Sequence, residues 1–137
     1  MNSSSPVLLV EDDLVDVMSV ERAFRELEIS NPLYTAGNGE EALESLRDES
    51  KPLPGIILLD LNMPRLNGVE LLGFLKSDER LRRIPVVVLT TSKEAKDRSM
   101  TFDLGIAGYM VKPVDYPGFL EVMRIIWRYW EQSETPP

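Results

Sequence analysis

The chain of 137 residues carries 15 basic and 23 acidic side chains, so its formal net charge is −8. It contains neither cysteine nor histidine, which excludes disulfides, thiolate nucleophiles, Ser-His-Asp triads and zinc sites built on these residues. No apolar run is long enough to span a membrane, and the first residues lack the features of an export signal. We therefore expect a cytoplasmic protein with no membrane contact, in which carboxylates, hydroxyls and lysine carry any chemistry.

The acidic excess lies in the first part of the chain. Residues 1–50 hold 12 acidic and three basic side chains. Because such a surface repels phosphate backbones, it predicts no nucleic-acid partner and favours divalent cations or basic partners. The length predicts a single domain, which we place at residues 6–131, with flexible ends at 1–5 and 132–137 and no output domain.

Apolar runs alternate with helical spacing along the whole chain. The first run is followed by the acidic turn Glu11-Asp12-Asp13, and the third, Ile56–Leu59, is apolar at every position, as in a strand buried on both faces. Thr91–Glu94 has the form of a capping box, which predicts a helix start. The expected strands are 7–10, 33–36, 56–59, 86–89 and 106–111, and the expected helices contain 17–27, 40–47, 68–76, 94–104 and 116–130.

Five strands alternating with five helices predict an α/β fold, a doubly wound five-stranded parallel sheet. In such sheets ligands bind beyond the carboxyl ends of the strands. The polar residues that directly follow the apolar runs are therefore the candidates for a site. They are Glu11, Asp12 and Asp13 after the first strand, Asp60 after the third, Thr90 after the fourth and Lys112 after the fifth.

Some of these residues also have a purely structural interpretation. Asp13 is better explained as the cap of the following helix than as a ligand. Thr90 stands beside Thr91 and Ser92, any of which can cap a helix. Lys112 alone would be typical of a surface, but Pro113 restricts it to an extended conformation and so helps to fix the direction of its amine.

Together, these residues suit phosphoryl transfer. Carboxylates brought close together repel one another unless they take up protons or bind a hard cation. Oxygen ligands without imidazole or thiolate favour Mg²⁺. An aspartate can then act as nucleophile toward phosphorus, with Lys112 as the neutralising cation and Thr90 as a hydrogen-bond donor.

The sequence resembles the receiver domain of bacterial two-component response regulators over residues 6–130. The matching motifs are Val10-Glu-Asp12, Leu58-Leu-Asp-Leu-Asn-Met-Pro64 with Asn67-Gly68, Leu89-Thr-Thr91 and Gly108-Tyr-Met-Val-Lys-Pro113. The resemblance implies the flavodoxin-like strand order 2-1-3-4-5. Glu11 stands where the family more often has Asp, and Asn67 replaces the usual Asp before the glycine, but neither change removes a group from the site.

The resemblance also implies a role for each site residue. Asp60 would be phosphorylated by a partner histidine kinase and would bind Mg²⁺, or Mn²⁺, together with Asp12. The backbone carbonyl of Asn62 would be a further ligand, and Glu11 would bind through water. Lys112 would contact the phosphoryl group, and its bond to Pro113 is often cis in such domains.

Further positions correspond to the signalling part of the family. Thr90 and Tyr109 would form the switch pair, and Asn62 and Ser92 fall where the family tunes autodephosphorylation. The signalling surface would comprise the helix 94–104, the strand 106–111 and the helix 116–130. Such a protein is not an enzyme in the usual sense, because it catalyses only its own phosphorylation and dephosphorylation.

Several segments are similar to the small response regulators that accompany bacterial phytochromes, which implies a bacteriophytochrome as the sensor kinase. They are Leu61-Asn-Met-Pro64, Arg80-Leu-Arg-Arg83, Leu89–Ser92 and Trp127-Arg-Tyr-Trp130.

The last two helices differ in their apolar patterns. The helix 116–130 has one apolar stripe of Tyr116, Phe119, Met123, Ile126 and Trp130, and a second stripe of Val122, Ile125 and Tyr129. The second stripe is either additional core or a homodimer face, and we favour the homodimer. The helix 94–104 has no regular apolar period, which predicts weak anchoring and a shift on phosphorylation.

Two other functions use parts of the same residue set. A haloacid-dehalogenase-like phosphatase also has an aspartate nucleophile, Mg²⁺, a hydroxyl and a lysine, but it needs a second aspartate where this chain has Asn62. A flavodoxin-like flavin protein must cradle a phosphate in its first loop, and Glu11, Asp12 and Asp13 would repel that phosphate.

Overall fold

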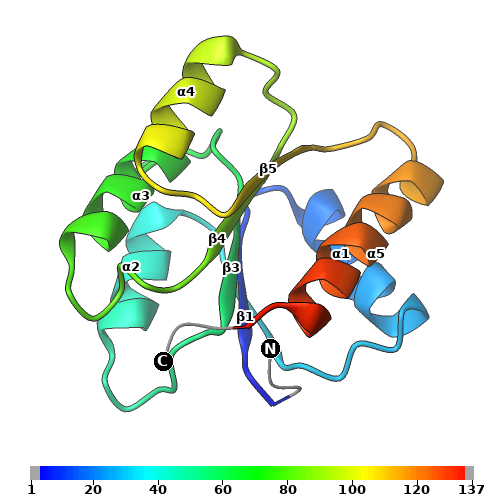
Figure 1. Ribbon diagram of the computed structural model, residues 1–137, viewed down its shortest axis with the longest axis horizontal. Coiled ribbons are helices and arrows are strands. Elements are labelled where there is room, and N and C mark those ends of the chain that lie inside the picture. Colours follow the sequence, from blue (N-terminus) through cyan, green and yellow to red (C-terminus); the bar gives the residue numbers. More distant parts are fainter. Residues whose placement is uncertain (1–3, 135–137) are drawn as a thin grey trace.

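The computed structural model describes residues 4–134 and contains one parallel sheet in the order β2-β1-β3-β4-β5, with helices on both faces (Figure 1). The predicted doubly wound α/β fold and its 2-1-3-4-5 order are thus confirmed. The strands are β1 (Val7–Val10), β2 (Leu33–Ala36), β3 (Ile56–Leu59), β4 (Val86–Thr90) and β5 (Gly108–Val111). The helices are α1 (Leu14–Glu26), α2 (Gly39–Arg47), α3 (Gly68–Ser77), α4 (Ala95–Asp103) and α5 (Tyr116–Gln132).

The helices form two layers. Figure 1 shows α1 and α5 on one face of the sheet and α2, α3 and α4 on the other. The central strands supply both cores because alternate side chains point to opposite faces. Val7 and Leu9 of β1 pack toward α1 and α5, whereas Leu8 and Val10 pack toward α2 and α3. This double burial explains why β1 and β3 are apolar at every position.

The strand register places the first and third strand ends side by side. Val10 pairs with Leu59, and the Asp60 N–H donates to the Val10 carbonyl at 3.0 Å. The residues that follow, Glu11 and Asp60, therefore leave the sheet at the same edge.

Three local expectations were wrong. The capping box at Thr91–Glu94 does not form, because the Glu94 N–H donates to the Ser92 hydroxyl at 3.3 Å, and α4 begins only at Ala95 without a side-chain cap. The last strand begins at Gly108 rather than at residue 106. No peptide bond is cis among residues 4–134, so the Lys112–Pro113 bond is trans; the Lys112 N–H extends the sheet by donating to the Thr90 carbonyl at 2.8 Å.

Helix α5 buries more of its surface than the predicted stripe. Trp127 is buried in addition to Phe119, Met123, Ile126 and Trp130, because α5 packs against α1 as well as the sheet; the rings of Trp127 and Phe24 lie 5.3 Å apart. The second stripe is divided, since Val122 is half-buried against the core while Ile125 and Tyr129 are 51% and 65% exposed. No helix within residues 4–134 has the length and apolarity that crossing a membrane requires.

Candidate functional site

Three carboxylates meet at the carboxyl edge of the sheet. Glu11 and Asp12 follow β1 and Asp60 follows β3, and each offers an oxygen atom within 4.8 Å of the others. Glu11 and Asp60 are buried, whereas Asp12 is exposed. The cluster is therefore open to solvent on the Asp12 side and enclosed on the side of the strands.

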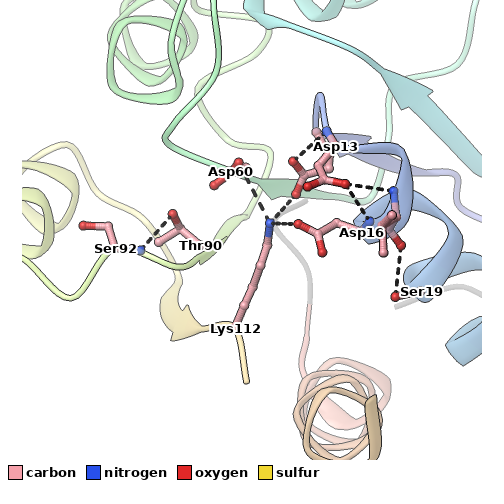
Figure 2. Close-up of polar contacts among 9 residues, drawn as sticks. Asp13, Asp16, Ser19, Asp60, Thr90, Ser92 and Lys112 are labelled. Carbon is pink, nitrogen blue, oxygen red and sulfur yellow. Dashed lines mark hydrogen bonds and ion pairs between the residues drawn. The ribbon is translucent and has the colours of Figure 1, made fainter. Parts of the chain in front are cut away.

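The ammonium group of Lys112 lies against this cluster (Figure 2). Its Nζ donates to Glu11, donates to Asp16 Oδ2 at 2.8 Å and lies 3.9 Å from Asp60 Oδ2. The Lys112 side chain is only 6% exposed. A buried cation thus balances the charge of carboxylates from β1, α1 and β3.

Burial changes the acid–base properties of this pair. Burial, reinforced by the nearby charge of Asp60, raises the pKa of Glu11 to about 7, although Lys112 acts in the opposite direction. Burial alone would lower the pKa of Lys112, but its hydrogen bonds to Asp16 and Glu11 outweigh that effect and raise its pKa. Lys112 therefore stays charged while Glu11 titrates near neutrality.

A close backbone contact fixes the position of Asp60. A Cβ atom on Gly68 would lie 2.5 Å from the Asp60 carbonyl oxygen, so only glycine lets the start of α3 approach the phosphoacceptor candidate this closely. The Gly68 N–H donates to the Leu61 carbonyl at 3.1 Å. Asn67 and Glu70 close a reciprocal capping box beside it. Asn67-Gly68 was part of the family motif, but its packing role could not be seen in the sequence.

One loop residue connects Thr90 and Tyr109. Thr90 is fully buried, and its Oγ1 accepts the Ser92 N–H at 3.3 Å. The Tyr109 hydroxyl donates to the Ser92 carbonyl at 3.0 Å. Figure 2 shows Thr90 and Ser92 together, on the other side of Asp60 from α1. The predicted switch pair is thus joined through the backbone of Ser92.

The structure brings Glu11, Asp12, Asp60 and Lys112 together, as the strand-end argument predicts. Asp13 instead caps α1, accepting the Val15 N–H at 2.8 Å. Asn62 is exposed in the loop after β3.

Sequence reasoning missed Asp16. The available signal was its spacing, because the side chain of the third residue after a helix cap reaches back toward the cap residue, which here is Asp13, next to Asp12 in the chain.

The donor set fits a hard divalent cation. The cluster offers carboxylate oxygens only, and Glu11, Asp12 and Asp60 are the residues that could hold such an ion. No Cys or His is available to bind a softer metal.

Comparisons with known proteins agree with this geometry. Residues 7–124 match the response regulator receiver domain family. The chain is 36% identical, over 95% of its length and 88% of the relative, to the probable methanogenesis regulatory protein FilR2 of Methanothrix harundinacea. It is 33% identical, over 99% of its length and 95% of the relative, to the response regulator Rcp1 of Synechocystis.

Two solved structures have the same fold. The phosphorylated cyanobacterial phytochrome response regulator RcpA superimposes with a TM-score of 0.92 at 32% identity, over 98% of this chain and 99% of that one. The Mn²⁺-bound form of Rcp1 has a TM-score of 0.90 at 33% identity, over 97% and 99%. The chain belongs to the response regulator receiver domain family and is related to the response regulators of phytochromes.

Proposed function

We propose that this protein receives a phosphoryl group on Asp60 from the phosphohistidine of a sensor histidine kinase. The observation that carries the proposal is the position of Asp60, which directly follows β3, lies in a cluster of carboxylate oxygens and faces the buried ammonium of Lys112. None of the 137 residues is a histidine, so none of them can be the phosphohistidine donor.

The chemistry is a single displacement at phosphorus. An Asp60 carboxylate oxygen forms the new bond to phosphorus while the phosphorus–nitrogen bond to the kinase breaks. The leaving imidazole nitrogen keeps the electron pair and takes up a proton from solvent. The Lys112 ammonium and the Thr90 hydroxyl then stabilise the charge on the phosphoryl oxygens.

A divalent cation, Mg²⁺ or Mn²⁺, completes the site. Asp12, Asp60 and the backbone carbonyl of Asn62 would hold it directly, and Glu11 would hold it through water. When bound, it supplies positive charge that Lys112 alone does not provide. Asn62 and Ser92 flank the phosphoryl group and set how fast water removes it.

The first two turns of α1 offer a docking surface for the kinase. Leu14, Val15 and Met18 are all exposed apolar side chains, and they lie at the start of the helix that Asp13 caps and that carries Asp16 beside the site. Relatives of this chain are phytochrome response regulators, which favours a phytochrome-type kinase. We expect faster phosphotransfer from such a kinase than from an unrelated sensor kinase, and equal rates would count against this partner.

Phosphorylation would be transmitted through Thr90. If its hydroxyl turns to the phosphoryl group, the Ser92 N–H loses its acceptor and the Tyr109 hydroxyl bond to Ser92 is disturbed. The α4-β5-α5 surface would then rearrange, beginning with α4.

Intact mass after incubation with Mg²⁺ and acetyl phosphate tests the proposal. We expect one phosphoryl group per chain in the wild type and none in Asp60→Asn or in excess EDTA. A phosphoryl adduct that persists in Asp60→Asn would contradict the assignment. Asp12→Asn, which keeps the side-chain shape, should reduce the adduct through loss of a cation ligand.

We also propose a homodimer formed through the exposed part of α5. The candidate face is Val122, Ile125 and Tyr129; Val122 is half-buried at its border, and the exposed Ile125 and Tyr129 line an apolar groove of about 210 Å³ between α5 and β5. Sedimentation at tens of micromolar, with and without phosphorylation, should show a dimer that Ile125→Asp weakens and Glu21→Gln does not. A monomer under both conditions would remove this proposal.

The other two hypotheses lose their support. Membership of the receiver family, over residues 7–124, leaves no observation in favour of a phosphatase. Asn62 remains where that class needs an aspartate. The acidic residues after β1 likewise leave no cradle for a flavin phosphate.

A further inference from the structure

Asp16 stands in a position where an acidic residue ordinarily serves its own helix. It is the third residue of α1 after the cap Asp13, the position that closes a capping box by accepting the N–H of the cap residue. In α3 the equivalent residue, Glu70, does this with Asn67 at 3.1 Å. In α1 the Asp13 N–H donates instead to Glu11 Oε2 at 3.2 Å, so the Asp16 carboxylate is available for another partner.

That partner is Lys112, 96 residues away along the chain. Asp16 Oδ2 lies 2.8 Å from Nζ, whereas the nearest Asp60 oxygen lies at 3.9 Å, beyond hydrogen-bond distance. Figure 2 shows the Lys112 side chain reaching from β5 to the first turn of α1, with its Nζ between Asp16 and Asp60. The helix N-terminus stabilises the negative charge that Asp16 brings.

The two anchors of the ammonium are not equivalent. Glu11 belongs to the carboxylate cluster that fits a cation, and Asp16 does not. When Glu11 also holds a water of the divalent cation, it is a weaker partner for Lys112, because the two positive charges compete for its carboxylate. Asp16 is then the anchor that remains.

We propose that Asp16 is a positioning residue for Lys112, holding the ammonium beside the cluster so that one N–H stays available to a phosphoryl oxygen on Asp60. An ammonium has three donors, and Glu11 and Asp16 take one each. This inference rests on the proposed function of Asp60. It assigns the orientation of Lys112 to Asp16, a residue outside the family motifs quoted above.

The test compares Asp16→Asn with two matched variants. Asp16→Asn keeps the shape and removes the charge, Asp16→Glu restores the charge on a longer side chain, and Glu21→Gln removes one charge from an exposed position of the same helix. Each protein is phosphorylated by acetyl phosphate at saturating Mg²⁺. We expect Asp16→Asn to be roughly tenfold slower, Asp16→Glu to recover part of the rate and Glu21→Gln to stay within about twofold of the wild type.

A second readout does not depend on phosphorylation. In ¹⁵N-lysine-labelled protein with Mg²⁺ bound, the Lys112 ammonium should give a slowly exchanging proton signal, assigned by its absence in Lys112→Arg. Asp16→Asn should shift this signal and accelerate its exchange, and Glu21→Gln should leave it unchanged. Unchanged helical circular dichroism shows that the variant is folded.

The outcomes separate the two proposals. A wild type that accepts no phosphoryl group overturns the function of Asp60 and the inference with it. A phosphorylated wild type with an Asp16→Asn rate within about twofold, or with an unaltered ammonium signal, overturns the role of Asp16 alone. An equal loss of rate in Glu21→Gln would show a general charge effect and would overturn it as well.

Discussion

Helices α3 and α4 lie next to each other on the same face of the sheet, yet they are held in different ways. Helix α3 has ten residues, begins with a reciprocal capping box and buries Gly68, Leu71, Leu72 and Leu75. Helix α4 has nine residues, has no side-chain cap and buries only Thr101. Similar lengths therefore conceal very different anchoring.

The difference in anchoring corresponds to the site residue that each helix follows in the chain. Helix α3 follows Asp60, which lies 3.9 Å from the Lys112 ammonium. Helix α4 follows Thr90 and is connected to it through Ser92. A phosphorylation switch requires two things: a phosphoacceptor that is held in a fixed position, and a loosely packed neighbouring element that can respond.

The largest expected effect comes from shortening one apolar side chain in each of the two helices. Leu72→Ala removes a fully buried side chain of α3 and should lower the free energy of unfolding by about 3 kcal/mol. Met100→Ala, on the exposed side of α4, should change it by less than about 0.5 kcal/mol. Urea unfolding measures both, and similar losses would mean that α4 is anchored as firmly as α3.

The next largest effect on stability is expected from replacing one of two glycines in α3. Gly68→Ala places a Cβ atom 2.5 Å from the Asp60 carbonyl oxygen and should cost about 2 kcal/mol and slow phosphorylation. Gly73→Ala meets no atom within 4 Å and should stabilise the helix by about 0.5 kcal/mol. If Gly68→Ala is tolerated like Gly73→Ala, the backbone behind Asp60 is less constrained than we conclude.

The smallest effect concerns how the free energy of unfolding depends on pH through Glu11, beside Asp60. The pKa of Glu11 is raised to about 7 from its ordinary 4.5, so between these values the folded chain binds more protons than the unfolded chain. The stability that Glu11 contributes is therefore full below pH 4.5 and is lost as the pH rises through about 7. In EDTA, the free energy of unfolding of the wild type, relative to that of Glu11→Gln, should fall by on the order of 1 kcal/mol between pH 5 and 8.

The exposed Glu44 provides the control for this measurement. Glu44→Gln should leave the pH dependence of unfolding as it is in the wild type. A wild type whose pH dependence matches that of Glu11→Gln would show that Glu11 ionises at an ordinary pKa.

The sequence was most informative where burial is complete. β1 and β3 could be located to the residue because both faces are covered, so every position is apolar. The acidic cluster followed from that result, since parallel strands present their carboxyl ends at one edge. The start of α4 could not be predicted in this way, because the Ser92 hydroxyl, and not Thr91, accepts the Glu94 N–H, and the same hydroxyl donates to Asp97.

Contacts between distant segments were beyond the sequence. Asp16 reaches Lys112 only because α1 and β5 meet at the same edge. Gly68 is tied to the Asp60 carbonyl by the path of the loop after β3. Trp127 is buried because α5 packs on α1 as well as on the sheet. Each depends on packing angles that a helical period does not contain.

Hydrogen exchange before and after phosphorylation tests the central comparison most directly. With Asp60→Asn treated identically as the control, we expect altered exchange in the segment 91–103 and unchanged exchange in α3. Exchange that stays the same in segment 91–103, or that changes equally in α3, would contradict the assignment of α3 as the fixed helix and α4 as the responding one.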